Sequence, residues 1–220
     1  MGSWPPSGKE SSTMYGVGDD YPAYYLSWYN AIVYCNTLSI KENRTPCYKI
    51  NNSTDPNNWG EIPTASDDTW NNVVCDFTVN GYRLPTEVEW EYAARGGNSL
   101  TGTQYSFAGS DTIDDVAWYT DNSAVDGTKV AHIVKTKNPN GLNLYDMTGN
   151  LREMCYDWGG QTLDDSTSFS GVTSGTSRVH RGGSFSNNEN SSYLYYRSNN
   201  WSPENSAYLN GFRVVYTATE

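Results

Sequence analysis

The sequence predicts an α+β domain with many irregular loops and a core built largely from aromatic side chains. Three observations lead to this fold class: two stretches with helical spacing, two short strand-like stretches near the C-terminus, and long connections rich in Asn, Ser, Gly and Asp. Leu, Ile, Val and Phe supply only 35 of the 220 residues. The 18 Tyr and 8 Trp residues compensate, because each such side chain buries about 150–250 Å².

The first helix is predicted over residues 27–42, where apolar residues recur every three or four positions and Ser27 suits the N-cap. The second is predicted after Thr86, because Thr86 and Glu89 form a capping box and Gly96 suits the left-handed end of a helix. Residues 178–184 and 211–216 are predicted strands. Residues 46–80 are predicted to form a long loop with one short hairpin, and residues 98–177 to contain turns and short strands.

The charge of the chain argues against several classes of partner. With 14 Lys and Arg against 25 Asp and Glu, the net charge is −11, which opposes binding to nucleic acids and to anionic membranes. No apolar run approaches the roughly 20 residues of a membrane helix. The first residues lack the pattern of a signal peptide, so we expect any export signal to lie outside this sequence or to have been removed.

The chain has four cysteines, namely Cys35, Cys47, Cys75 and Cys155. No two of them form a Cys-x-x-Cys motif, which disfavours a zinc site. Two disulfides and four free thiols are both compatible with the sequence.

Four ordered motifs carry a family resemblance. Residues 82–97 read YRLPTEVEWEYAARGG, residues 27–36 read SWYNAIVYCN, residues 144–150 read LYDMTGN, and the sequences RGGS and GFR occur at 181–184 and 211–213. Together they resemble the formylglycine-generating enzyme (sulfatase-modifying factor) family. The resemblance implies a C-type-lectin-like fold with two main helices and a small twisted antiparallel sheet. We expect residues 1–20 to be an N-terminal loop segment and residues 21–220 to form a single domain.

The resemblance also bears on catalysis. In catalytic members, two cysteines after the Gly-Gly-Ser motif bind copper, and these positions fall on Asn187 and Ser192 here. Neither side chain supplies the soft thiolate that Cu(I) prefers. An iron-dependent branch of the family uses a histidine cluster, whereas this chain has only His132 and His180. We therefore expect no enzymatic activity and no cofactor for catalysis. The alternative is an oxidase-like enzyme with a different site.

Residues 185–210 have an unusual composition: 17 of the 26 are Asn, Ser or Tyr, and the segment lies between the RGGS and GFR motifs. It resembles the variable region of a diversity-generating retroelement protein, in which template adenines are randomised during reverse transcription. Antibody binding loops use the same residues, because Tyr gives contact area at low entropy cost and Ser and Asn adapt their hydrogen bonds. Arg197 and Pro203 are predicted to be fixed framework positions. The predicted ligand-binding residues are Ser186, Asn187, Asn188, Asn190, Ser191, Tyr193, Tyr195, Tyr196, Ser198, Asn199, Asn200, Trp201, Asn205, Ser206, Tyr208 and Asn210.

A structural Ca²⁺ site is implied by the resemblance at residues 146–153. Its ligands would be the side chains of Asp146 and Glu153 and the carbonyl oxygens of Gly149 and Leu151, and such hard oxygen donors suit Ca²⁺. The alternative is a carboxylate pair neutralised by Arg152 or by another cation.

The leading functional hypothesis is a non-catalytic binding protein whose diversified surface contacts a protein or another macromolecule. Such a display surface is useful at the cell surface or after export, so we expect that location. The alternatives are an oxidase-like enzyme, a calcium-dependent carbohydrate lectin, and a structural member in which residues 185–210 are a solvated loop with inward-pointing tyrosines.

Overall fold

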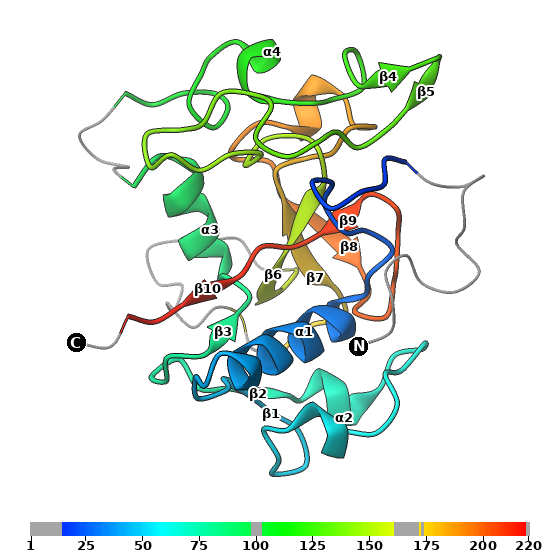
Figure 1. Ribbon diagram of the computed structural model, residues 1–220, viewed down its shortest axis with the longest axis vertical. Coiled ribbons are helices and arrows are strands. Elements are labelled where there is room, and N and C mark those ends of the chain that lie inside the picture. The colour runs from blue at the N-terminus through cyan, green and yellow to red at the C-terminus, as the bar shows by residue number, and fades with distance from the viewer. Residues whose placement is uncertain (1–14, 98–102, 161–171, 173, 219–220) are drawn as a thin grey trace.

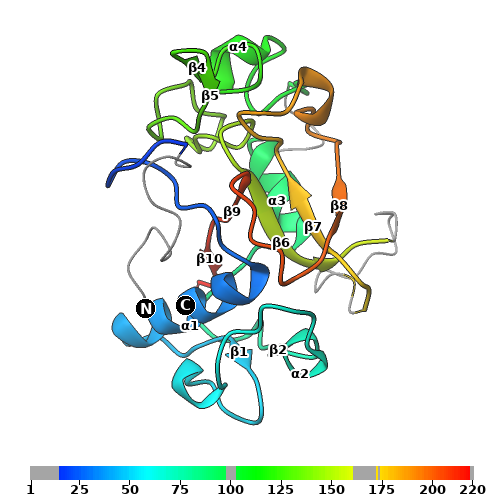
Figure 2. The ribbon, with the colours of Figure 1, turned by 90° about the vertical axis from the view of Figure 1, so that its right-hand side faces the viewer.

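The computed structural model describes residues 15–97, 103–160, 172 and 174–218, and a four-stranded sheet lies at its centre (Figures 1 and 2). The strand order is β8-β7-β6-β9. The strands are β6 (Arg152–Trp158), β7 (Arg178–Arg181), β8 (Ser198–Trp201) and β9 (Asn210–Gly211). The pairs β6–β7 and β7–β8 are antiparallel, as predicted, whereas β9 is parallel to β6. The parallel pair arises because the chain crosses from the β8 edge to the opposite edge before it enters β9.

Two main helices cover the sheet. The first is α1 (Trp28–Lys41) and the second is α3 (Glu87–Ala94). Met154 of β6 packs in one buried cluster with Trp28 of α1, whereas its neighbour Cys155 packs in another with Trp90 of α3. Successive residues of a strand point to opposite faces, so each helix covers one face.

Both predicted helices are confirmed, with their predicted caps. Ser27 caps α1, and its side chain accepts a hydrogen bond from the backbone N–H of Asn30. Thr86 and Glu89 form the capping box of α3. Gly96, two residues after α3, has a φ of +78°. Helix ends in this chain therefore follow local rules that the sequence alone expresses.

The strands deviate more from prediction. The seven-residue strand β6 was missed, because it is buried on both faces and its sequence REMCYDW lacks polar–apolar alternation. The strand predicted at 211–216 is two separate short strands. Residue 211 ends β9, whereas β10 (Val215–Tyr216) pairs with β3 (Tyr82–Arg83) outside the central sheet.

Smaller elements complete the fold. β1 (Tyr48–Lys49) pairs with β2 (Val74–Cys75), but the chain between them contains η2 (Pro56–Asn58) and α2 (Asp68–Asn71) rather than a tight hairpin turn. Beyond α3 come α4 (Ile113–Val116), the pair β4 (Ala124–Val125) and β5 (Thr128–Lys129), and the turn η3 (Glu189–Ser191). Among the described residues, no helix combines the length and apolarity needed to cross a bilayer.

Aromatic side chains dominate the core, as the composition predicts. Trp28, Tyr29, Tyr48, Trp59 and Trp70 belong to a single buried cluster under α1. The guanidinium of Arg178 lies 3.6 Å from the ring centroid of Trp28 and donates to the carbonyl oxygen of Tyr156 at 2.6 Å. Burial beside these rings lowers the pKa of Arg178 to about 9.

Candidate binding face

The segment 185–210 is fixed to the domain at intervals by side chains that point inward. Phe185 is fully buried, and its carbonyl oxygen accepts a hydrogen bond from the Ser123 hydroxyl at 2.6 Å. Leu194 is buried, and its backbone N–H donates to the carbonyl oxygen of Ser106 at 3.0 Å. Pro203 is buried, and its carbonyl oxygen accepts from the backbone N–H of Trp28 at 2.9 Å. These anchors leave short exposed stretches between them.

A buried ion-pair network holds the middle of the segment. Arg197 donates through Nε to Oε1 of Glu87 at 2.5 Å and through Nη2 to Oε2 of the same carboxylate. Glu87 is fully buried, and Arg181 of β7 contacts it from Nη1 at 3.2 Å. Arg181 also pairs with Glu91. Two guanidinium groups therefore neutralise one buried carboxylate at the start of α3, which agrees with the prediction that Arg197 is a framework residue.

The predicted contact residues fall into three classes of exposure. Eight side chains are exposed and seven are half-buried, and Asn210 alone is buried. The exposed residues are Asn188, Asn190, Tyr195, Tyr196, Asn199, Asn200, Asn205 and Ser206. The half-buried residues are Ser186, Asn187, Ser191, Tyr193, Ser198, Trp201 and Tyr208. The solvated-loop alternative, with its inward-pointing tyrosines, explains the exposed tyrosines poorly.

Asn210 is the exception, and its prediction as a contact residue is wrong for this conformation. It is fully buried in β9 beside Arg152 of β6. Neither its Nδ2 nor its Oδ1 atom has a hydrogen-bond partner among the described residues. The residue type suggested a surface position, but the parallel strand pair places the side chain inside.

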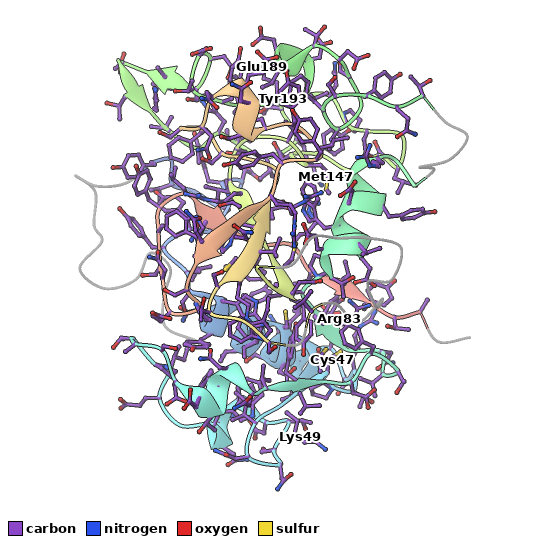
Figure 3. All side chains as sticks on the ribbon, turned by 180° about the vertical axis from the view of Figure 1, so that it is seen from behind. Cys47, Lys49, Arg83, Met147, Glu189 and Tyr193 are labelled. Carbon is purple, nitrogen blue, oxygen red and sulfur yellow. The ribbon has the colours of Figure 1, made fainter. Side chains whose placement is uncertain are left out.

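A stack of three aromatic rings rises from the core to the surface. The ring of Phe107, which is buried, lies 5.0 Å from that of Tyr193, and Tyr193 lies 5.2 Å from Tyr195 in a second parallel stack. Tyr195 is 68 % exposed. Figure 3 shows Glu189 and Tyr193 together at one end of the molecule, far from Cys47 and Lys49. The stack fixes a flat aromatic surface at that end of the binding face.

Two further aromatic residues of the predicted contact set, Trp201 and Tyr208, pack differently. Trp201 lies over the guanidinium of Arg152, with 4.0 Å between the guanidinium carbon and the ring centroid. Tyr208 stacks on Tyr15 at 4.4 Å and lies near Phe185. Sequence reasoning treated residues 1–20 as a loop and missed this role of Tyr15; residues 1–14 lie outside the described residues. It also missed Phe107, whose buried ring supports Tyr193, because the sequence around Phe107 carries no signal of this contact.

The two positions that the resemblance matches to copper-binding cysteines make ordinary hydrogen bonds. Asn187 accepts a hydrogen bond from the Ser184 hydroxyl at 2.7 Å, and Ser192 is fully buried against the Asn188 carbonyl oxygen. The four cysteines are free thiols outside this segment. His132 stacks on Trp118, and His180 is buried in β7. No group of three or more His, Cys, Asp or Glu side chains in the described ranges is arranged to hold a metal ion.

The predicted calcium ligands have other partners. Both carboxylate oxygens of Glu153 accept hydrogen bonds from Arg213, at 2.5 and 2.6 Å, and Oε2 also accepts from the indole N–H of Trp90. Oδ2 of Asp146 accepts from the backbone N–H of Lys135 at 2.8 Å. Burial raises the pKa of Asp146. In this arrangement a calcium ion would compete with Arg213 for the Glu153 carboxylate.

Arg213 therefore pairs with the Glu153 carboxylate and is the other cation that the alternative allowed beside Arg152. Asp146 and Glu153 line a cavity of about 660 Å³ together with Lys135, Tyr145 and Arg213. Calcium binding at this place stays a prediction.

Comparison with known sequences identifies a family match over nearly the whole chain. Residues 1–218 match the Sulfatase-modifying factor enzyme 1-like domain. A protein named Chaperone protein LppX from Paenibacillus barcinonensis is 39 % identical over 155 residues, which are 64 % of this chain and 53 % of that protein. The formylglycine-generating enzyme of Streptomyces coelicolor is 35 % identical over 165 residues, 68 % of this chain and 51 % of the enzyme. The chain thus spans about half the length of these curated relatives.

Solved structures give a consistent result. Treponema denticola variable protein 1 superposes with a TM-score of 0.79 at 34 % identity, over 96 % of this chain and 76 % of that protein. CarF superposes with a TM-score of 0.67 at 27 % identity, over 92 % of this chain and 69 % of that one. The fold is therefore shared with a variable protein as well as with the family of enzymes.

Proposed function

The chain belongs to the sulfatase-modifying factor family, and we propose that it is a non-catalytic member that binds a partner macromolecule through residues 186–208. One observation carries this proposal. Within the segment, side chains that anchor it to the core alternate with Asn, Ser and Tyr side chains that face solvent. Such an arrangement lets surface residues change without loss of the fold.

The chemistry of the exposed residues suits a macromolecular partner. Tyr195 and Tyr196 offer large exposed rings, and such residues often dominate binding energy. The surrounding Asn and Ser side chains supply hydrogen bonds that adapt to different partners. A stable complex with a protein would bury about 800 Å² on this side. Similarity to a protein named as a chaperone supports a protein partner over other classes.

We further propose that the segment is diversified by a retroelement. Support comes from the confinement of the Asn, Ser and Tyr excess to residues 185–210 and from the likeness to Treponema denticola variable protein 1. Sequencing this coding region in many cells of one population tests the idea. The proposal is supported if substitutions are confined to codon positions that correspond to adenines of the retroelement template and do not occur in the codons of Arg197 and Pro203. Substitutions spread evenly along the chain contradict it.

The competing proposal is an enzyme, which the 35 % identity to a formylglycine-generating enzyme favours. Against it stand Asn187 and Ser192, which cannot replace a pair of thiolates. The deciding assay incubates the protein with Cu(I) and a cysteine peptide that the Streptomyces coelicolor enzyme oxidises. We expect no aldehyde product, and turnover comparable to that enzyme would refute the non-catalytic proposal.

Binding is tested directly by display. One library randomises the exposed positions 188, 190, 195, 196, 199, 200, 205 and 206, and a matched library randomises the anchors Phe185, Leu194, Arg197 and Pro203. We expect folded clones and binders to several target proteins from the first library only. If both libraries give folded binders at similar frequency, the division into anchors and contact residues is wrong.

Because a display surface acts outside the cell, we also propose export or cell-surface attachment, which fractionation of the source cells would test.

A further inference from the structure

The face of the central sheet that carries Met154, and that α1 covers in part, also holds an unusual buried polar cluster. Arg152 of β6 lies beside Asn210 of β9, and two residues further along β6, Met154 lies beside His180 of β7. Cross-strand neighbours and residues two apart share one face of a sheet. Arg152, His180 and Asn210 therefore project from the same face, and they are only 7 %, 2 % and 0 % exposed.

Each member of this cluster has at least one polar atom without a hydrogen-bond partner among the described residues. His180 bonds through Nδ1 to the carbonyl oxygen of Arg178 at 3.1 Å, which leaves the lone pair of its ring on Nε2. The orphaned atoms are Nε of Arg152, Nε2 of His180, and both Nδ2 and Oδ1 of Asn210. Buried polar groups in native proteins are nearly always paired, so an accumulation of unpaired atoms at one place requires an explanation. An acceptor group that is absent from the isolated chain would provide the donors among these atoms, Nε of Arg152 and Nδ2 of Asn210, with partners.

Arg152 differs from the other arginines of the described core in what its guanidinium contacts, although the Nε atoms of Arg83, Arg178 and Arg181 are also unpaired. Arg83, Arg181 and Arg213 each pair with a glutamate. Arg178 lies between two indole rings and donates to a backbone carbonyl oxygen. Arg152 has one ring, that of Trp201, and no carboxylate partner within the described ranges. Its burial without an anion lowers the pKa of the guanidinium to about 10.

Three aromatic residues of the binding segment act on this cation. The Trp201 ring stacks on it, and Tyr196 and Tyr208 favour its charged form electrostatically, which raises its pKa. Trp201 also lies 6.1 Å from the ring of His180. All three are positions predicted to vary, whereas Arg152 lies on β6, outside the segment. The access to Arg152 therefore depends on which side chains occupy positions 196, 201 and 208.

We propose that Arg152, with Asn210, forms an anion-recognition site beside Trp201 of the binding segment that receives a carboxylate group. The guanidinium and the Asn210 amide N–H would donate to the carboxylate oxygens, which makes charge-assisted hydrogen bonds. The proposal rests on the proposed function where the carboxylate is an Asp, Glu or C-terminal group of a protein partner. A free small carboxylate has the same chemistry.

The first test requires no partner. Sodium acetate replaces sodium chloride at constant ionic strength, and thermal unfolding is followed for the wild type, Arg152→Met and the control Arg44→Met. Arg44 also lies over aromatic rings, those of Tyr82 and Tyr216, but beside Glu42. We expect a saturable rise of about 2 °C in the wild type and Arg44→Met, and none in Arg152→Met. An equal rise in all three refutes the site.

The second test measures how much Arg152 lowers the stability of the domain in the absence of a ligand. Replacing an uncompensated buried charge with a similar-sized apolar residue is often stabilising. We expect Arg152→Met to unfold in chloride at a temperature equal to or higher than that of the wild type. A fall of several degrees would show that Arg152 is a structural residue and would overturn the proposal.

A third variant keeps the proposal falsifiable if the closed site excludes acetate. Trp201→Ala removes the ring above Arg152 and should enlarge the acetate effect, and the double variant with Arg152→Met should abolish it. If Trp201→Ala responds no more than the double variant, the site does not bind carboxylate.

The source of the anion is then resolved with a selected protein binder. Loss of its affinity on Arg152→Met, together with a normal acetate response in the wild type, identifies the partner's carboxylate. Failure to select any binder would count against the proposed function and not against the acetate result.

Discussion

Removing the guanidinium of Arg197 should loosen the binding segment at its centre and destabilise the domain. Arg197→Met leaves the fully buried carboxylate of Glu87 with Arg181 as its remaining ionic partner. A hydrogen bond to a charged group contributes about 1.5–3 kcal/mol, and breaking a buried pair outright costs about 3–5 kcal/mol. Because Arg181 still compensates Glu87 and Arg197 is partly exposed, we expect a loss of about 2–3 kcal/mol.

Urea denaturation gives the free energy of unfolding, and thermal unfolding gives an independent value. For a chain of this size, 1 kcal/mol corresponds to about 2–4 °C in Tm, so Arg197→Met should lower Tm by about 4–12 °C. Arg95→Met is the control at the rim of the same network, because Arg95 forms a half-buried ion pair with Glu91 four residues away on α3, and Glu91 also pairs with Arg181. Ion pairs between residues four apart on a helix contribute about 0.3–0.5 kcal/mol.

Hydrogen exchange at residues 194–201 separates a local from a global effect. We expect faster exchange there in Arg197→Met, beyond what the lower stability alone explains, and no change in Arg95→Met. The reasoning is refuted if Arg197→Met costs less than 1 kcal/mol, or if it costs no more than Arg95→Met. Either result would mean that Arg181 alone compensates Glu87 and that the segment is positioned by packing.

Three further predictions concern other residues. Burial raises the pKa of Asp157 to about 6, so between about pH 4 and 6 this carboxyl binds more protons in the folded state than in the unfolded state, and stability falls as pH rises through that window. Asp157→Asn should remove this fall in urea titrations. Asp76→Asn, which replaces a carboxyl group whose pKa is lowered, should not remove it. Adding 1 mM Ca²⁺ after EDTA treatment should change Tm by less than about 1 °C, because the Glu153 carboxylate is already occupied; a rise of about 5 °C that Glu153→Gln abolishes would establish the predicted calcium site. Tyr195→Ala should cost under about 0.5 kcal/mol of stability but about 2 kcal/mol of partner affinity. Tyr193→Ala, which breaks the stack on Phe107, should reduce both stability and affinity. Equal stability losses in the two variants would contradict the assignment of Tyr193 as a supporting residue and Tyr195 as a contact residue.

The candidate site could be predicted from the sequence to a limited depth. The composition of residues 185–210 located the segment, and its exposed Tyr and Asn residues are consistent with that prediction. Asn210 has the same residue type but the opposite environment, because β9 inserts into the sheet as a parallel strand. Residue type therefore indicated the segment, whereas strand pairing decided which face each side chain occupies.

Local signals by themselves determined the two main helices. Capping at Ser27 and Thr86 acts through hydrogen bonds between residues three apart, so the sequence expresses it without knowledge of the rest of the chain. The ordered motifs also indicated the family, and Asn187 and Ser192 led to the prediction that the chain lacks the thiolates of catalytic members.

Only the tertiary structure decided the contacts between distant residues. Glu87 meets Arg197 across 110 positions, Glu153 meets Arg213 across 60, and Tyr15 reaches Tyr208 from the other end of the described chain. Such pairs form because sheet order and helix packing place their elements together, and no spacing in the sequence encodes them. The unpaired Arg152 is equally invisible in the sequence, because a charge is uncompensated only after the fold has removed it from water.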